Sequence, residues 1–447
     1  ERAVVYRFKF NRPDSVNITF RSRQKAFLQV TSDNTLEGWE EFEKTRQYFH
    51  AEFNQSFVQS LTFKAGAMAP GQQAEGNAIG MILRFKHSEK PVEVRIGLSY
   101  IDAAQASANL KNETNGRSFE TIRDNGYQIW KKELGKIQVE GGTEREKRIF
   151  YTSLYRTMER MVNISESGRY FSGYDKTVHN DEGRPFYVDD WLWDTYRSLH
   201  PLMLILNPDQ QADMVQSYVR MYEQSGWMPG FPQFYGDFPA MIGFHSAAFV
   251  WDAYQKGARN FDVQKAYEGL KKNALQGTMV PWLGGPGCSL DSFYHQKGWF
   301  PALPEDSAET VKVVNSFEKR QSVSVTLEHS YDDWCLAQLA RELGDTLNYR
   351  RFMKRSENYR NVFNPSTGFF APKMADGRWI EPFNPQLSGG IGSRSFFAEN
   401  NAWTWNFSVQ HNIPGLIQLL GGNDALTDRV DALFNEPACI AKWQFMG

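Results

Sequence analysis

The stretch Tyr187–Pro208 reads YVDDWLWDTYRSLHPLMLILNP, and the rest of the chain is organised around it. Its first half combines tryptophan and tyrosine rings with three aspartates and an arginine, and its second half is mainly apolar. This pattern predicts a helix over residues 190–206. A spacing of i, i+4 and i+7 places Asp190, Asp194 and Arg197 on one face of that helix.

An adjacent face of the same helix carries Trp193, Tyr196 and His200. Charged groups bind the hydroxyls of a sugar and aromatic rings cover its C–H faces, so the two faces together suit a polyhydroxylated ligand. A second interpretation is a buried Asp–Arg pair that holds a core helix in place, with the rings as packing. Spacing alone leaves the two interpretations equally open.

The composition narrows the class of protein. A chain of 447 residues is long enough for two or three domains, and its 50 basic and 52 acidic residues nearly cancel. Because there is no basic block, we expect no nucleic-acid partner, and no apolar run is long enough to span a membrane. Three scattered cysteines indicate neither a zinc site nor a disulfide framework. Aromatic residues make up 15% of the chain, which fits a bulky core or a sugar-stacking cleft.

Hydrophobic alternation with period two dominates the first part of the chain, as far as Asp102. Many short strands separated by turn residues predict an antiparallel β-sandwich over residues 1–102. The first strand begins at once, so we expect the sandwich to lack strands upstream. The predicted strands are Ala3–Phe10, Asn17–Phe20, Phe27–Thr31, Gln47–Phe53, Phe57–Phe63, Ala78–Phe85 and Val92–Tyr100.

After Asp102 the apolar residues recur every three or four positions. We expect a linker helix region at 103–142 and a helical toroid at 143–447, with long functional loops at 170–189, 228–239, 279–321 and 368–394. No sequence repeat is visible, which disfavours an open solenoid. The predicted helices are Phe119–Ile137, Glu144–Val162, Asp190–Leu206, Gln210–Ser225, Met241–Gly257, Val263–Leu275, Val323–Gly344, Thr346–Phe363, Glu399–Val409, Ile413–Leu420 and Asp424–Phe434.

One carboxylate stands among aromatic residues in the stretch FFAENNAWTW at 396–405. Burial against rings raises the pKa of a carboxyl group, as a general acid requires if it is to keep its proton near neutral pH. Trp403 lies four residues after Glu399 and could cover it. Alternatively, Glu399 accepts backbone hydrogen bonds at the start of a helix. The two interpretations are about equally supported by the sequence.

Two further groups of residues have either a functional or a purely structural role. Glu328 and Asp332 lie four residues apart on a predicted helix, either as an acid cluster at a cleft or, as we favour, as part of a salt-bridged helix start. His245 precedes an aromatic-rich segment, where a lone histidine is more often a core residue than a ligand.

Several of these segments, in chain order, resemble the exo-acting α-mannosidases of glycoside hydrolase family 92. The resemblance implies an N-terminal β-sandwich packed on an (α/α)6 barrel, with a calcium-dependent, inverting active site between them. It extends from about Val92 to Phe434. The segments that carry it are IGLSYIDAAQASANL at 96–110, FYTSLYR at 150–156, LWDTYRSLHPL at 192–202, residues 243–254, TLEHSYDDW at 326–334 and ENNAW at 399–403.

The resemblance also implies roles for individual residues. Glu399 matches the glutamate of the family's Glu-Gly-Asn-x-Trp motif and would be the general acid, although Asn400 stands where the family has glycine. The pocket for the terminal mannose would be lined by the side chains of Trp193, Asp194, Arg197, Trp403 and His245.

We therefore expect an enzyme that removes terminal non-reducing α-mannosides, with α-1,2 as a candidate linkage, from mannan or N-glycan-type oligosaccharides. The family implies a calcium ion and a periplasmic or extracellular location. A competing hypothesis is a non-catalytic mannose-binding or glycan-binding protein on the same scaffold. A phosphorolytic barrel enzyme would need a phosphate pocket of clustered arginine, lysine and histidine, which the sequence does not indicate.

The family's general base and calcium motifs are expected beyond Gly447. Asn435-Glu436-Pro437 imitates one of them but lacks its flanking glycine and its Ser-His pair. We expect the chain to be cut at both ends and, if it ends at Gly447, to be an inactive fragment, because an acid without a base loses most of its rate.

Overall fold

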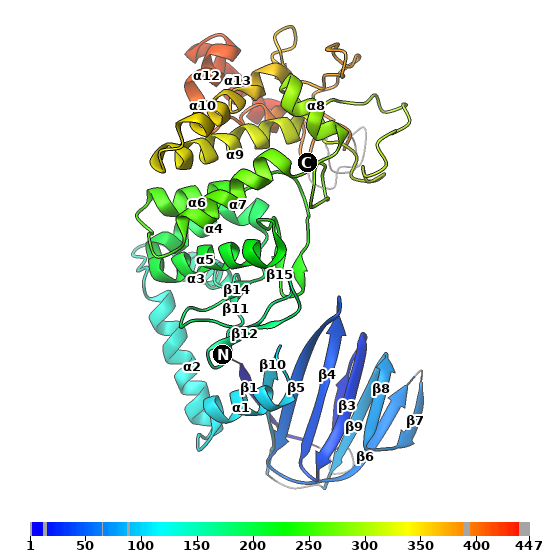
Figure 1. Ribbon diagram of the computed structural model, residues 1–447. Helices are drawn as coiled ribbons and strands as arrows, with labels where there is room; N and C mark the ends of the chain where they lie inside the picture. The colour runs from blue at the N-terminus through cyan, green and yellow to red at the C-terminus, as the bar shows by residue number, and fades with distance from the viewer. Residues whose placement is uncertain (1, 12–15, 65, 87–89, 388–393, 438–447) are drawn as a thin grey trace. The chain divides into compact units, whose positions relative to one another are not determined.

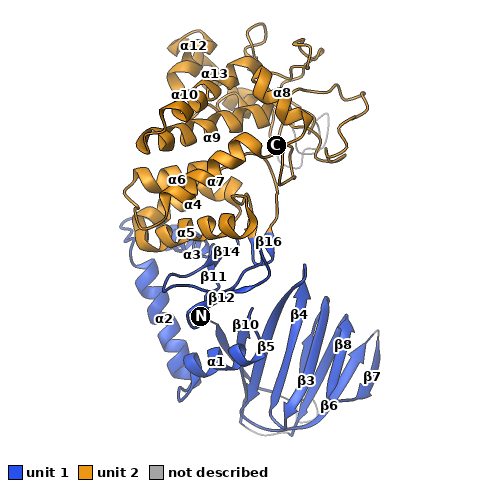
Figure 2. Ribbon diagram, viewed as in Figure 1, with its two compact units in different colours: residues 1–189, 233–236 blue, residues 190–232, 237–447 orange. Residues whose placement is uncertain are grey.

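A computed structural model describes residues 2–11, 16–64, 66–86, 90–387 and 394–437 (Figure 1). The chain forms two compact units, one of residues 1–189 and 233–236 and the other of residues 190–232 and 237–447 (Figure 2). The first unit begins with antiparallel sheets and the second is helical. This order confirms the predicted fold class of a β domain followed by a helical domain.

Two antiparallel sheets form the start of the first unit. The six-stranded sheet has the order β1 (Ala3–Phe8), β10 (Val92–Ser99), β5 (Thr45–Phe53), β4 (Thr35–Phe42), β3 (Lys25–Ser32) and β8 (Gln73–Asn77). The four-stranded sheet has the order β2 (Asn17–Arg21), β9 (Ile79–Phe85), β6 (Phe57–Lys64) and β7 (Ala67–Pro70).

A shared core holds the two sheets together as a sandwich. Ala26 and Leu28 of β3 are buried at alternate positions, as a period of two requires, and they share one cluster with Met81 and Leu83 of β9. Strand β4 was not predicted, because its sequence TLEGWEEF is rich in glutamate. A Cβ atom at its Gly38 would lie 2.2 Å from the carbonyl oxygen of Phe27 on β3, so only glycine fits there. Strands β7 and β8 were missed as well.

Three helices and four short strands complete the first unit. Helix α1 (Ala103–Thr114), which the sequence did not single out, begins at Asp102, whose side chain accepts a hydrogen bond from the backbone N–H of Gln105. The unit continues beyond the predicted boundaries at 102 and 142, and the three-part division of the chain stays a prediction. The other elements are α2 (Phe119–Leu134), α3 (Glu144–Arg156), β11 (Val162–Asn163), β12 (Arg169–Phe171), β13 (Val178–Asn180) and β14 (Tyr187–Val188).

The second unit consists mainly of helices. They are α4 (Leu192–Leu206), α5 (Pro208–Ser225), α6 (Ser246–Gln255), α7 (Val263–Gln276), α8 (Ser289–Lys297), α9 (Ser322–Glu342), α10 (Thr346–Arg355), a 3-10 helix (Asn358–Val362), α11 (Ala402–Trp405), α12 (Ile413–Leu420) and α13 (Asn423–Asn435). Short strand pairs lie at β15 (Pro232–Gln233), β16 (Gly236–Asp237), β17 (Phe363–Asn364) and β18 (Phe369–Phe370). Helix α8 lies in a segment that the sequence predicted to be loop. None of the helices in the described ranges is long and apolar enough to cross a membrane.

Helix α9 lies beside α6, α7 and α10, and almost all of its side chains are buried (Figure 1). Val323, Val325 and Leu327 enter the main core cluster of this unit, together with Phe396 and Phe397. A helix buried on all sides has no solvent face, so its polar residues must find partners inside the protein.

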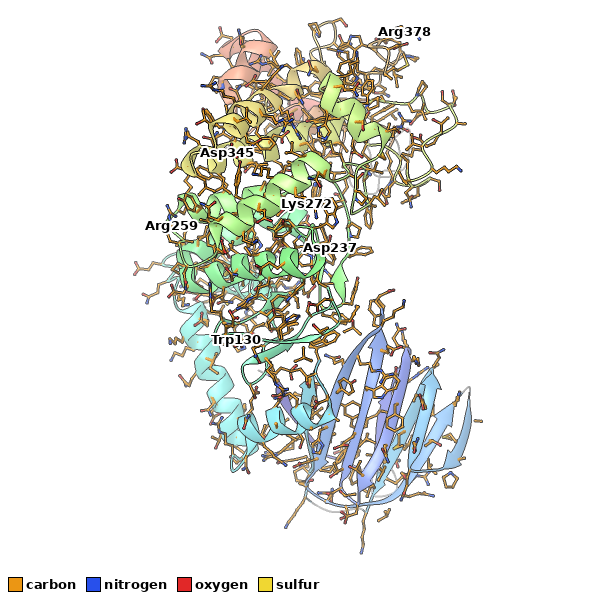
Figure 3. The ribbon with its side chains drawn as sticks, in the orientation of Figure 1. Trp130, Asp237, Arg259, Lys272, Asp345 and Arg378 are labelled. Carbon is orange, nitrogen blue, oxygen red and sulfur yellow. The ribbon has the colours of Figure 1, made fainter. Side chains whose placement is uncertain are left out.

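Neighbouring helices are also linked by side-chain hydrogen bonds. Asp345, labelled in Figure 3, caps α10 by accepting a hydrogen bond from the backbone N–H of Asn348 at 3.1 Å. Its second oxygen accepts a hydrogen bond at 2.8 Å from the hydroxyl of Tyr267 on α7. One aspartate thus satisfies a helix N-terminus and links two helices.

Candidate active site

Asp190 lies before the first turn of α4 and is fully buried. It accepts hydrogen bonds from the hydroxyls of Thr195 and Tyr218, each at 2.7 Å, and lies 2.9 Å from Nε2 of His200. Burial alone would raise the pKa of Asp190, but the charge of His200 and these hydrogen bonds outweigh it and lower the pKa below its usual value. The predicted helix start at Asp190 is therefore wrong. The prediction that Asp190 shares one helical face with Asp194 and Arg197 is wrong too, because Asp190 lies before the helix and binds buried side chains of the core.

Arg197 lies in the second turn of α4, against aromatic rings and a buried carboxylate. Its guanidinium carbon is 5.1 Å from the centre of the Trp193 ring and 4.8 Å from that of Tyr196. Its Nη2 donates a 2.9 Å hydrogen bond to Oε1 of Glu328 on α9. The side chain of Arg197 is 45% exposed, whereas that of Glu328 is 3% exposed. One edge of the guanidinium is thus fixed in the interior while the rest reaches solvent.

His245 is buried at the start of α6, between two carboxylates of α9. Its Nδ1 lies 2.8 Å from Oδ1 of Asp332, and its Nε2 lies 3.5 Å from Oε2 of Glu328, which is an electrostatic contact rather than a hydrogen bond. The ring stacks on Tyr196 at 4.4 Å. Burial lowers the pKa of His245, but the charges of Asp332 and Glu328 outweigh it and raise the pKa above its usual value. His245 therefore lies behind Glu328, inside the unit.

Glu399 precedes α11 instead of lying on a helix, and the predicted helix over 399–409 is wrong at both ends, because α11 extends only over Ala402–Trp405. Its backbone has a φ of 52°, in the left-handed region that non-glycine residues rarely adopt. The preceding residue is held by two hydrogen bonds, from Ala398 N–H to Ser324 and from the indole of Trp405 to the Ala398 carbonyl. Burial, and then the charge of Asp194, raise the pKa of Glu399, and Arg394 opposes them.

Trp193 and Trp403 both pack against the main core cluster of the helical unit. The ring of Trp403 meets Phe369 edge to face at 4.9 Å, and the guanidinium of Arg429 lies 5.3 Å from its centre. The indole nitrogens of Trp193 and Trp403 are buried and have no hydrogen-bond partner among the described residues. Both rings are thus fixed by packing.

The predicted site residues all belong to the helical unit, and three parts of the chain supply them: α4, the start of α6 and the stretch 399–403. Asp194 is close enough to Glu399 for its charge to act on it, and Arg197 and His245 both contact Glu328. Glu328 was considered as part of a salt-bridged helix start. It is salt-bridged, but it and Asp332 lie in the interior of α9. Their spacing of four residues was the signal that they share a face.

Calcium binds to six to eight oxygen atoms. Within the described parts of the chain, no group of three or more histidine, cysteine, aspartate or glutamate side chains could hold a metal ion. The nearest buried carboxylates, Glu328 and Asp332, already bind Arg197, His245 and the backbone N–H of Phe244. Glu328 and Asp332 therefore do not form a calcium site.

Comparison with protein-family models matches both parts of the chain. Residues 1–99 match the glycosyl hydrolase family 92 N-terminal domain, and residues 105–445 match the glycosyl hydrolase family 92 catalytic domain. The second match alone covers more than half of the chain.

Similar proteins come from a bacterium and a fungus. The structure of a family GH92 inverting mannosidase of Bacteroides thetaiotaomicron (BT2199) has a TM-score of 0.83 and 26% identity, over 93% of this chain and 55% of that one. An α-mannosidase of the same family and organism (BT3965), in complex with mannoimidazole, has a TM-score of 0.83 and 26% identity, over 97% and 57%. A protein of Arthroderma benhamiae named "uncharacterized secreted glycosidase" is 26% identical over 82% of this chain and 46% of its own length.

The chain thus spans about half the length of these relatives. The motifs around Asp194 and Glu399, the order of the two domains and the family-model matches agree with one another. This chain belongs to glycosyl hydrolase family 92.

Proposed function

We propose that this chain carries the sugar-binding groups and the general acid of an exo-acting α-mannosidase. The observation that supports this best is the raised pKa of Glu399, a half-buried carboxyl close to the charge of Asp194. The two similar mannosidases of Bacteroides thetaiotaomicron support the substrate class. The reaction is hydrolysis of a terminal non-reducing α-mannoside with inversion.

In this reaction Glu399 protonates the leaving glycosidic oxygen, and its raised pKa favours the protonated form that a general acid needs. Asp194 and Arg197 bind hydroxyls of the terminal mannose, since charged partners make the stronger hydrogen bonds. Trp193 and Trp403 cover the C–H faces of the ring. We expected His245 to line the pocket. Instead, it acts on the pocket indirectly, through its contact with Glu328.

Inversion also requires a general base, roughly 6.5–9.5 Å from the acid, which leaves room for the attacking water. We propose that the base and the calcium ligands belong to the part of the family's length that this chain does not span. The helices of the second unit would then form part of an (α/α)6 barrel. We propose mannan or N-glycan-type oligosaccharides as substrates, with α-1,2 as a candidate linkage. The name of the fungal relative supports a periplasmic or extracellular location.

The test uses a protein that spans the family's full length, so that the base is present, and compares Glu399→Gln with the unchanged protein on an aryl α-mannoside and on an α-mannobiose. Loss of the general acid should lower kcat by about 10²–10⁴ on the disaccharide, and less on the aryl substrate, whose leaving group needs no proton. Glu305→Gln, which removes an exposed carboxylate of the same unit, is the control. NMR of the first-formed sugar anomer tests inversion.

Equal losses on both substrates would remove Glu399 from the acid role. A protein that binds mannosides without hydrolysing them, and with an affinity indifferent to Glu399, would be the glycan-binding protein of the competing hypothesis. Absence of any mannoside binding would contradict both.

A further inference from the structure

Four charged side chains from three helices form a continuous chain in the helical unit. Arg197 of α4 binds one oxygen of Glu328, and the other oxygen lies 3.5 Å from Nε2 of His245. Nδ1 of His245 lies 2.8 Å from Asp332. We refer to Arg197, Glu328, His245 and Asp332 as the charge relay. Only Arg197 reaches solvent, because the side chains of the other three are at most 3% exposed.

Charge balance decides the protonation state of the charge relay. Two carboxylates and Arg197 leave one uncompensated negative charge, and a protonated His245 removes it. Buried charges are stable only when they are paired and hydrogen-bonded. The raised pKa of His245, caused by Asp332 and Glu328 against the effect of burial, agrees with this balance.

The surroundings of His245 offer no alternative cation. Tyr196 stacks on its ring, and burial with nearby positive charge lowers the pKa of His329 well below its usual value, so that His329 is neutral. Burial likewise keeps the thiol of Cys335 protonated by raising its pKa. Asp333, the residue after Asp332 on α9, has a pKa that burial raises to about 7, but its carboxylate binds Arg355.

Arg197 needs such support to act as a sugar ligand. Its stacking on Trp193 and Tyr196 restricts the plane of the guanidinium, and its Nε donates a 3.2 Å hydrogen bond to the backbone carbonyl of Trp193 on the same helix. Glu328 accepts a second hydrogen bond, from a buried position on a neighbouring helix. A fixed guanidinium loses less rotational freedom when a hydroxyl binds to it.

We propose that Glu328 is a positioning residue, backed by His245, which fixes Arg197 for the hydroxyls of the terminal sugar. Affinity for the sugar then depends on pH. Below the pKa of His245 the charge relay is neutral and Arg197 is held in place. Above that pKa, His245 is neutral and the charge relay carries a buried negative charge. This charge either draws Arg197 inward or causes Glu328 to move. This proposal rests on the sugar-binding role of Arg197 proposed above.

The test is calorimetric titration of the protein with methyl α-mannoside between pH 5 and pH 9. The unchanged protein should bind more weakly as pH rises through the pKa of His245. Glu328→Gln should weaken binding about tenfold or more at low pH, because a neutral amide orients Arg197 poorly, and it should flatten the pH dependence. Thermal unfolding checks that the variant is folded.

Asp333→Asn is the matched control. Asp333 follows Asp332 on α9, is equally buried and binds Arg355 at 2.7 Å, but it does not contact Arg197. This variant should keep both the affinity and the pH dependence of mannoside binding. A double-mutant cycle of Arg197→Ala and Glu328→Gln should be strongly non-additive, because each substitution alone already removes the contact between Arg197 and Glu328.

Three results would overturn the proposal: unchanged affinity in Glu328→Gln, equal weakening in Glu328→Gln and Asp333→Asn, or additive losses in the cycle. A protein that binds no mannoside at any pH contradicts the proposed function itself, and with it the ligand of the charge relay. The two failures are therefore distinguishable.

Discussion

Burial and the nearby charge of Asp194 together raise the pKa of the Glu399 carboxyl. Asp194 is in the first turn of α4, whereas Glu399 precedes α11, so folding brings two distant parts of the sequence into one electrostatic environment. A pair of carboxyl groups whose environments differ is a common means of keeping one protonated while the other stays charged.

Replacing Asp194 should therefore change the pH dependence of catalysis. A general acid works when protonated, so activity falls as pH rises through the pKa of Glu399. Asp194→Asn removes a negative charge, lowers that pKa and should move the alkaline limb of kcat/KM to lower pH, by up to about one unit. Activity should also drop, because we propose that Asp194 binds the sugar. Asp252→Asn, at an exposed aspartate paired with Lys256, should leave the limb in place. An unmoved limb in Asp194→Asn would show that the two carboxyls are not coupled.

Asp190 should matter for stability more than for sugar binding. Asp190→Ala leaves the buried hydroxyls of Thr195 and Tyr218 and the imidazole of His200 without their acceptor. We expect a loss of about 3–5 kcal/mol in the free energy of unfolding, measured by denaturant titration. An exposed surface pair is typically worth at most about 1 kcal/mol, which sets the expectation for Asp252→Asn. Similar losses in both variants would refute a pinning role for Asp190.

The same residue predicts how stability depends on pH. The folded pKa of Asp190 is lowered, so the folded state binds this proton less readily than the unfolded state. The contribution of Asp190 to stability is therefore present above its unfolded pKa and is lost as pH falls through its folded pKa. If the pKa of Asp190 were the same in the folded and unfolded states, the folded state would lack this contribution and acid unfolding should begin at a higher pH. Denaturant titrations of the unchanged protein and Asp190→Ala between pH 2 and pH 7 should converge at low pH.

Gly243 should be required to place His245. Its φ is 81°, and a Cβ atom there would lie 2.7 Å from Nε2 of His245 and 3.1 Å from a carboxylate oxygen of Asp332. Gly243→Ala should weaken mannoside binding by displacing the imidazole. Gly257→Ala is the control, because Gly257 has a φ of 98° but no atom within 4 Å of an added Cβ. It shares the backbone strain without the clash, at a cost of about 1–3 kcal/mol in stability. Equal sugar affinity in the two variants would contradict a steric role.

Calcium dependence, which the family resemblance implies, has a direct test. If the prediction is correct, treatment with EGTA abolishes mannose release, and calcium restores it better than magnesium. Magnesium is smaller and demands a stricter octahedral geometry, so it replaces calcium poorly in flexible oxygen-rich sites. Full activity after exhaustive chelation would show that the calcium prediction is wrong.

Periodicity predicted most of the elements, and its failures have local causes. Helix α12 was predicted with its observed bounds, Ile413–Leu420, because Asn412 caps it and Gly421 ends it. Strand β4 was missed because three of its eight residues are glutamate, which is uncommon in strands. Helix α8 was missed because a short helix between long loops has little periodicity to detect.

The sequence by itself determined the two kinds of fold, through a change of hydrophobic period near Asp102, and it singled out Glu399 as a candidate through the rings around it. Tertiary structure decided which acidic residues do what. Asp190 and Asp194 look alike in the sequence. In the structure, Asp190 is buried and accepts hydrogen bonds from hydroxyls, whereas the charge of Asp194 raises the pKa of Glu399. Helical spacing relates residues within one element. The partner of Arg197 is on α9 and that of His245 on the same helix, and such contacts between elements depend on packing that no local pattern encodes.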